Sequence, residues 1–187
     1  MKTSCGAIFY SFNPQGRLGI ILGREGRNWL PFKGCCEYKE SFEDAAIREI
    51  FEETCGIIKL NSIALDHKFA SKHKRYLIGL VQVPYSLIQD FTDRRVTEQR
   101  ANFCEKKGLR FFSIEKVLDH QRVHGITKAS IRYYWNKLLY LRGGNANNDI
   151  IPQNTRLSWQ CDRRCDEETR PCRVARPVTA VTVVPPL

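Results

Sequence analysis

The stretch that begins at Ser41 constrains the fold and the chemistry of this chain more than any other. Ser41 is a favourable helix N-cap, and Asp44 stands three residues later in an arrangement that resembles a capping box. Ile47, Ile50 and Phe51 then recur at the spacing of one helical face. The pattern predicts a helix over residues 41–54 that packs this apolar face against a core.

Three glutamates crowd the opposite face of this predicted helix. Glu52 and Glu53 follow Glu49 by three and four residues, which places the three carboxylates side by side. Each pair of like charges costs about a few tenths of a kcal/mol, and a bound divalent cation would reverse that cost. Arg48 can reach Glu52 and relieve part of the repulsion without a metal. A solvated acidic face is therefore the alternative to a metal site.

The residues around the glutamates favour the metal site. Gly34, Glu40 and the run R-E-I-F-E-E at 48–53 follow the spacing G-x5-E-x7-R-E-U-x-E-E, where U is aliphatic. This spacing resembles the signature of the Nudix hydrolases. The resemblance is close over residues 29–56 and looser over residues 4–141.

The resemblance implies an α/β fold, namely a Nudix-type α/β/α sandwich with a mixed sheet and a loop-helix-loop metal site. It implies a Nudix pyrophosphohydrolase that uses Mg²⁺ or Mn²⁺ to hydrolyse a diphosphate linkage, since such ions stabilise charge on phosphate oxygens. Carried over by position, Arg48 would orient the glutamates and Glu40 would support the loop or a further metal. Four groups would bind the metal: Glu49, Glu52, Glu53 and the carbonyl of Gly34.

Two departures from the signature concern the turns that flank the helix. Cys55 stands where the signature has glycine, with Gly56 one place later. A turn that requires positive φ would strain Cys55, so we expect the helix to end one residue late. Lys39 also replaces a common glycine. Upstream, the run W-L-P-F-K-G at 29–34 resembles the W-x-F-P-K-G lead-in of RNA-decapping relatives, with proline and phenylalanine exchanged.

A general base can lie outside the signature. In some Nudix enzymes a glutamate on a later loop binds metal or activates water, and Glu105, six residues before Phe111, stands at a similar distance from its strand. Glu105 is therefore the first candidate for this catalytic role, and Glu98 is the second. A solvated loop acid is an equally good interpretation of each.

The net charge of +10 favours acidic partners such as nucleic acid or nucleotides. The surplus lies outside residues 40–53, because that window holds six acidic residues and one basic residue. Basic residues form two groups, and both fit a polyphosphate or an RNA backbone, although a solubilising surface is the alternative. The groups are Lys68, Lys72, Lys74 and Arg75, and then Arg94, Arg95 and Arg100.

With this lead-in and these two basic groups, the chain resembles the mRNA-decapping Nudix proteins, including those of large DNA viruses. The implied reaction releases m7GDP from capped RNA and leaves a 5′-monophosphate. One aromatic among Trp29, Tyr10 and Phe12 would stack on the methylated base. The predicted substrate-binding residues are Lys33, Lys72, Lys74, Arg75 and Trp29.

Two alternatives to decapping remain open. A small-molecule Nudix hydrolase would act on dinucleoside polyphosphates, nucleoside triphosphates or diphosphoinositol polyphosphates, whose dense negative charge also suits the basic groups. An inactive, RNA-binding Nudix-like protein is the second alternative, which Cys55 and the altered lead-in favour and the retained glutamates oppose.

Residues 1–143 are expected to form one Nudix domain, with a hairpin of strands at 5–12 and 18–22. Further strands are expected at 62–69, 76–83 and 109–112, a loop or short helix at 89–107, a short helix at 113–118, and a final helix through Ile131, Tyr134, Trp135 and Leu138. Residues 144–187 read as a disordered C-terminal tail. Within it, the alternation at 178–184 offers an edge strand, although the flanking prolines weaken that interpretation.

No apolar stretch approaches the roughly 20 residues that cross a bilayer, so we expect no membrane partner. The N-terminus offers no export signal, which predicts a reducing, cytoplasmic location (the host cytoplasm for a viral protein) and free thiols at the eight cysteines. The sequence leaves the oligomeric state open.

Overall fold

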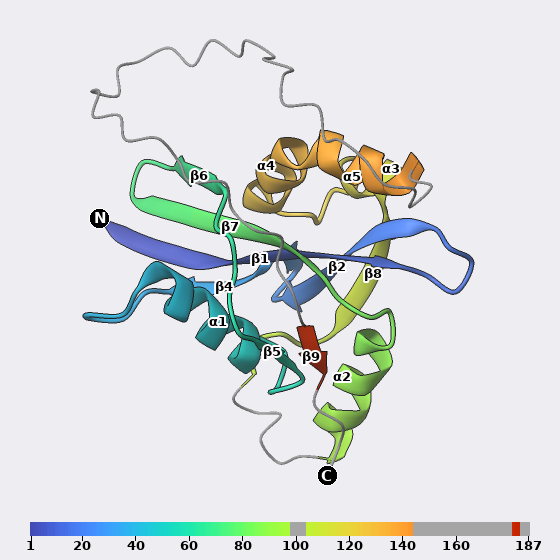
Figure 1. The fold of residues 1–187 in the computed structure, drawn as a ribbon, viewed down its shortest axis with the longest axis horizontal. Coiled ribbons are helices and arrows are strands. Elements are labelled where there is room, and N and C mark those ends of the chain that lie inside the picture. Colours follow the sequence, from blue (N-terminus) through green and yellow to red (C-terminus); the bar gives the residue numbers. More distant parts are fainter. Residues whose placement is uncertain (98–103, 144–180, 184–187) are drawn as a thin grey trace.

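The computed structural model of the chain describes residues 1–97, 104–143 and 181–183. Its centre is a mixed sheet that helices cover on both faces, with α1 (Phe42–Glu53) and α2 (Leu87–Thr97) on one face (Figure 1). The other face carries α3 (Ile114–Val117), α4 (Gly125–Tyr133) and α5 (Trp135–Gly143). This arrangement is the α/β/α sandwich that the Nudix resemblance implies.

The sheet is organised around β1 (Lys2–Phe12), which pairs in parallel with β7 (Lys74–Gln82) and antiparallel with β2 (Leu18–Glu25). The predicted hairpin between β1 and β2 is confirmed. Asn13 fixes its turn, because the Asn13 side chain accepts hydrogen bonds from the amides of Gln15 and Arg17 at 3.1 and 2.8 Å.

The sheet splits beside β1, and this split positions the residues of the site. Residues 9–12 of β1 pair with β2, whereas residues 4–7 pair with β4 (Phe32–Cys35). Farther along, β2 pairs with β3 (Asn28–Leu30) on one side and β8 (Leu109–Ser113) on the other. The segment from β3 to β4, which sequence analysis did not predict as strands, therefore passes through the opening between β1 and β2.

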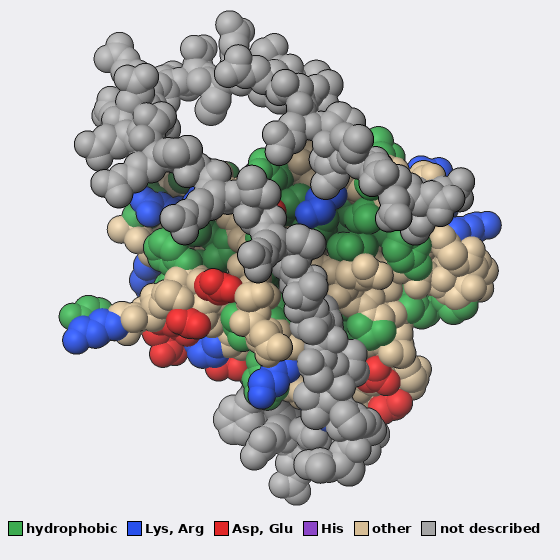
Figure 2. Space-filling model, viewed as in Figure 1, with side chains coloured by type: hydrophobic (Ala, Val, Ile, Leu, Met, Phe, Trp, Pro, Cys, Tyr) green, Lys and Arg blue, Asp and Glu red, His purple; other side chains and the backbone are tan. Residues whose placement is uncertain are grey.

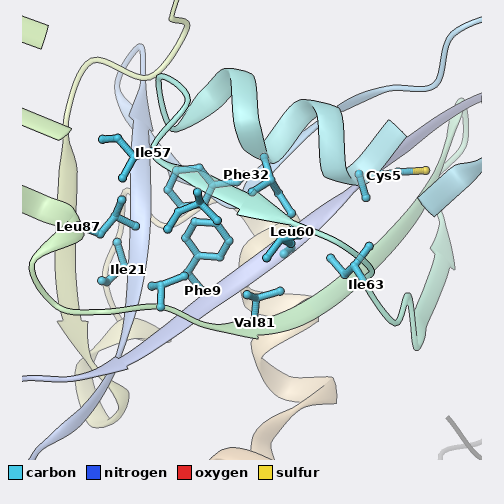
Figure 3. Close-up of a cluster of buried hydrophobic side chains, with 14 of the residues drawn as sticks. Cys5, Phe9, Ile21, Phe32, Ile57, Leu60, Ile63, Val81 and Leu87 are labelled. Carbon is cyan, nitrogen blue, oxygen red and sulfur yellow. The ribbon is translucent and has the colours of Figure 1, made fainter. Parts of the chain in front are cut away.

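Two hydrophobic clusters hold the helices on the sheet. Below α1 and α2, Phe9 and Phe32 stack with their ring centroids 4.2 Å apart, and Ile50 of α1 packs in the same cluster (Figure 3). On the other face, Ile131 and Leu138 are buried against the sheet, as predicted. Because side chains alternate along a strand, β1 supplies both clusters.

The buried face of α1 differs from the prediction. Ser41 caps the helix as expected, its Oγ accepting from the Asp44 amide at 3.1 Å. Ile50 is buried, but Phe51 is 43% exposed, and the buried positions include Ala46 and Glu53. The apolar stripe was therefore assigned wrongly at Phe51, because a glutamate with buried partners takes part of the packed face.

Two other predicted elements differ in the structure. Of the strand expected at 62–69 only the end forms, within β6 (His67–Ala70), and an unpredicted strand β5 (Ile58–Leu60) precedes it. The segment between them instead binds the start of α1, where the Ile63 amide donates to Glu43 Oε1 at 2.9 Å. The final helix breaks between α4 and α5 at Tyr134, whose buried hydroxyl donates to the Ile78 carbonyl at 2.7 Å.

The segment 89–107, expected as a loop or short helix, contains most of α2, while Glu98 and Arg100 lie outside the described residues. In the C-terminal region, β9 (Val181–Val183) pairs antiparallel with β5, in agreement with the edge strand considered from sequence. The rest of the predicted tail at 144–187 lies outside the described residues. No helix in the described part of the chain is long and apolar enough to cross a lipid bilayer.

The backbone adopts positive φ at both positions where the sequence departs from glycine, with φ of 66° at Lys39 and 54° at Cys55. Helix α1 nevertheless ends at Glu53, and the Gly56 amide closes its C-terminus by donating to the Phe51 carbonyl at 2.7 Å. The expected late end of the helix is therefore wrong, because Cys55 accepts the left-handed conformation instead.

Lys39 offers a direct measure of this backbone strain. Lys39→Gly is expected to raise the free energy of unfolding by up to about 1 kcal/mol, because a left-handed L-residue costs more than glycine loses in chain entropy. Urea unfolding measures the change. Lys39→Ala is the matched control and is expected to give no gain, since alanine keeps the strain; equal gains in both variants would contradict this explanation.

Candidate metal and active site

Glu53 is the buried centre of the site. Its side chain lies at the last turn of α1, beside the opening in the sheet, and the residue is only 4% exposed. Glu53 Oε2 accepts from the Lys33 amide of β4 at 2.7 Å, and Oε1 pairs with Lys106 Nζ at 3.0 Å. Burial raises the pKa of Glu53 to about 7, although Lys106 and the Lys33 amide oppose the rise.

Lys106 is a site residue that sequence analysis missed. Its side chain is fully buried, and Nζ also pairs with Glu25 Oε2 at 2.9 Å. Gly23 makes room for the aliphatic stem, since a Cβ at Gly23 would lie 2.6 Å from Lys106 Cδ. Lys106 stands beside Lys107 in a polar run, which gives no sign that its side chain is buried. The glycine at position 23 of β2 is the one sequence feature that fits this contact.

Three carboxylates meet around this ammonium group. Glu25, Glu53 and Glu105 each offer a carboxylate oxygen, and the three oxygens lie within 4.8 Å of one another. The structure thus brings the predicted Glu105 to Glu53 and adds Glu25, which was not predicted. Carboxylates this close require compensating cations, and a cluster of hard oxygen donors suits Mg²⁺ or Mn²⁺. The donor set therefore fits a divalent metal.

Arg48 bonds to three other glutamates, the contacts expected if it orients them as the resemblance implies. Its guanidinium forms two hydrogen bonds with the Glu40 carboxylate, at 2.9 and 3.0 Å. It also donates to Glu49 Oε1 at 2.9 Å, to Glu52 Oε2 at 3.1 Å and to the Cys35 carbonyl at 3.0 Å. These bonds fix the loop before α1 to the helix, and acidic side chains gather over this part of the surface (Figure 2).

The predicted metal ligands divide into separate groups. The Glu49 carboxylate packs directly against the Cα of Gly34, in the space that a Cβ would fill. The Gly34 carbonyl accepts from the Ser4 hydroxyl at 2.9 Å, and Gly34 pairs with Cys5 of β1. Glu52 is 56% exposed and held by Arg48. Of the four predicted groups, only Glu53 belongs to the carboxylate cluster around Lys106.

The Glu49 carboxylate is influenced both by the residues around Arg48 and by the carboxylate cluster around Lys106. Burial raises the pKa of Glu49, the hydrogen bond from Arg48 opposes that rise, and the nearby charges of Glu52 and Glu105 add to it. Because Glu105 influences Glu49 as well as meeting Glu53, the two groups of acids share one electrostatic environment. A cation placed there would stabilise several of these carboxylates at once.

The predicted substrate-binding residues occupy different places. Lys33 is half-buried beside the cluster, and burial lowers the pKa of its ammonium group. Lys72 lies in the turn between β6 and β7, while Lys74 and Arg75 pair with Lys2 and Thr3 at the start of β1. Strand β1 separates this basic hairpin from the signature loop, because Thr3 pairs with Arg75 on one side and its carbonyl accepts from the Cys36 amide at 3.0 Å on the other.

The three candidate stacking residues lie elsewhere. The Trp29 ring contacts Phe112 edge-on, with ring centroids 5.3 Å apart, on the face of the sheet that carries α3 to α5. Tyr10 donates its hydroxyl to Gln82 Oε1 at 3.2 Å, and Phe12 is exposed beside the β1–β2 turn. The structure therefore does not bring these aromatics to the carboxylate cluster.

A family model described as NUDIX domain matches residues 4–133. The chain belongs to the Nudix family. By this family match the chain is a Nudix pyrophosphohydrolase. No match was found among curated proteins.

Solved structures share the Nudix fold at low sequence identity. A mutT/nudix family protein from Listeria innocua is 18% identical with a TM-score of 0.54, covering 74% of this chain and 94% of that one. The Ap4A hydrolase of C. elegans is 17% identical with a TM-score of 0.51, covering 74% and 98%. NrtR of Shewanella oneidensis is 14% identical with a TM-score of 0.55, covering 74% and 64%.

Metal binding to this Nudix domain is expected to depend on pH through Glu53. Because the pKa of Glu53 is about 7 and a metal requires the ionised carboxylate, Mn²⁺ is expected to bind about tenfold more tightly at pH 8 than at pH 6. Titration calorimetry at both pH values measures this ratio. Glu53→Gln is expected to bind more weakly and to lose most of the pH dependence; the same affinity at both pH values in the unmodified chain would contradict the assignment.

Lys106→Met is expected to lower the free energy of unfolding by about 3 kcal/mol, because it leaves the buried Glu53 carboxylate without its cation. Added Mg²⁺ or Mn²⁺ should restore part of the loss. Thermal melts with and without metal measure both effects. Lys107→Met is the control: Lys107 is exposed, so little change is expected there. The same change in melting temperature for both variants would show that the buried ion pair does not contribute this much to the free energy of unfolding.

Proposed function

We propose that this Nudix pyrophosphohydrolase removes the cap from RNA, releasing m7GDP and leaving an RNA with a 5′-monophosphate. The observation that carries the proposal is the basic hairpin of Lys72, Lys74 and Arg75, which only strand β1 separates from the loop that Arg48 ties to α1. An RNA whose capped end reaches the carboxylates would meet these cations with its phosphates. A cytoplasmic location, in the host cytoplasm for a viral protein, agrees with such a substrate.

The acids of the site are proposed to hold Mg²⁺ or Mn²⁺. Glu53, Glu49, Glu52 and the Gly34 carbonyl are the proposed ligands, and the ion would supply positive charge to the diphosphate oxygens. Arg48 holds Glu49 and Glu52 in place through its hydrogen bonds. Burial of Glu53 keeps water away from its bonds to Lys33 and Lys106.

Glu105 is proposed as the general base. It is exposed, so a water molecule can reach it, and its carboxylate lies within 4.8 Å of the oxygens of Glu53 and Glu25. Glu105 would accept the proton of the attacking water while the diphosphate bond breaks.

A cap-release assay tests the proposal. Cap-labelled RNA, free cap dinucleotide and Ap4A are offered separately with Mg²⁺ or Mn²⁺, and m7GDP release from the RNA is expected to be fastest. Glu53→Gln should lower that rate by about 100-fold or more, since even residues that only support a metal ligand cost 10–100-fold. Glu115→Gln, which removes a carboxylate from α3 on the other face of the sheet, should leave the rate unchanged.

Two results would overturn decapping. Equal or faster turnover of Ap4A or the dinucleotide would favour a small-molecule hydrolase. Ap4A is included as a substrate because the C. elegans Ap4A hydrolase has a similar fold. Equal RNA binding by the unmodified chain and Glu53→Gln, without hydrolysis by either, would favour an RNA-binding Nudix-like protein.

A further inference from the structure

An arginine-lined cavity of about 710 Å³ opens beside β2 and β3. Arg24 of β2, Arg27 of the β2–β3 turn, Arg110 of β8 and Arg122 of the segment before α4 line it. Sequence analysis did not single out any of these arginines, because they are scattered along the chain and only the fold brings them together. The cavity lies outside the carboxylate site described above.

The cavity is lined by positive charges that no acidic lining residue neutralises. No acidic residue lines it, and within the described ranges none of its four arginines forms an ion pair with a carboxylate. Arg48 shows the contrast, since three carboxylates surround its guanidinium. Four like charges around one cavity repel, and an anion with several oxygens would relieve that repulsion through paired hydrogen bonds.

The walls of the cavity are held by the sheet. The Arg24 amide donates to the Gly108 carbonyl at 2.8 Å, and the Trp29 amide donates to the Arg122 carbonyl at 2.8 Å. The Arg110 guanidinium lies over the Phe112 ring, 5.1 Å from its centroid. Because the backbone around the arginines is already fixed, binding a ligand requires little ordering of the chain.

The position of the cavity restricts the kind of ligand that it serves. Glu25 contacts Lys106, and a side chain at Gly23 would meet Lys106 as well, so these positions face the carboxylate cluster. Arg24 lies between them on β2 and therefore faces the opposite side. The carboxylate cluster and the cavity therefore lie on opposite faces of β2, and a ligand that reaches both must be long enough to pass around the sheet, as a polymer is.

Trp29 adds a second feature to the cavity. It is half-buried, lines the cavity with the arginines, and is paired with Arg24 across β2 and β3. Lys33 follows Trp29 by four positions, a span of at most about 13 Å along the chain at about 3.3 Å per residue. Aromatic side chains beside a basic groove are the usual means of holding an unpaired nucleotide chain, because a base stacks on the ring while its phosphates meet the cations.

We propose that this cavity binds the phosphodiester backbone of single-stranded RNA downstream of the capped end. The arginines bind the phosphates, and Trp29 stacks on a base. The inference rests on the proposed function, since it assigns the body of the capped RNA to a surface separate from the site of hydrolysis. It also gives Trp29 a role away from the cap.

The test is binding of a fluorescent 5′-monophosphate RNA of about 12 nucleotides, followed by anisotropy without metal over a range of salt concentrations. The double variant Arg110→Gln/Arg122→Gln is expected to bind at least tenfold more weakly. Its slope of log affinity against log salt should fall by about 1.4, at about 0.7 per lost phosphate contact. Lys59→Gln/Lys137→Gln is the matched control, with the same loss of charge at exposed positions outside the cavity.

Hydrolysis separates this inference from the proposed function. In the arginine variant, KM for capped RNA is expected to rise while kcat and the turnover of free cap dinucleotide stay unchanged. Equal RNA affinity in the arginine variant and its control would overturn the inference, even if the chain removes caps. Competition by inorganic tripolyphosphate as strong as that by RNA would also overturn it, in favour of a small-polyphosphate site. Arginine-dependent RNA binding without cap release would instead contradict decapping alone.

Discussion

The buried contact between Lys106 and Glu53 joins the parts of the molecule that form the site. It connects the segment before β8 with the end of α1, and through Glu25 it also includes β2. A carboxylate as buried as Glu53 is stable only with several donors, and here an ammonium group and a β4 amide supply them. The acid proposed here as a metal ligand is thus held in place by the protein's own cation, which a bound metal would have to share or displace.

The turns around α1 show that tertiary contacts determine the loop-helix-loop conformation. Lys39 and Cys55 keep positive φ although neither is glycine. On the N-terminal side, Arg48 binds the Cys35 carbonyl; on the C-terminal side, the Gly56 amide closes the helix. These contacts outweigh about 1–2 kcal/mol of strain per left-handed residue. The glycines of the signature are therefore favourable for this geometry but not required by it.

Local patterns and long-range packing explain what the sequence could and could not predict. The β1–β2 hairpin and the cap at Ser41 depend on residues close in sequence, and both were predicted correctly. Lys106 escaped prediction because its burial depends on space beside Gly23, more than eighty positions earlier. Phe51 misled the helical pattern, since periodicity alone does not show that Glu53 replaces an apolar side chain in the packed face.

The two faces of β2 separate functions that the net charge of +10 combines. At Glu25 the strand contributes to a carboxylate cluster, and at Arg24 it contributes to a cavity lined with arginines. Adjacent residues on one strand thus supply opposite charges to opposite faces, because side chains alternate. The acidic face repels a polyanion and the basic face attracts one. For the RNA substrate proposed above, binding at the basic face would therefore precede and orient hydrolysis at the acidic face, with the sheet keeping the two surfaces apart.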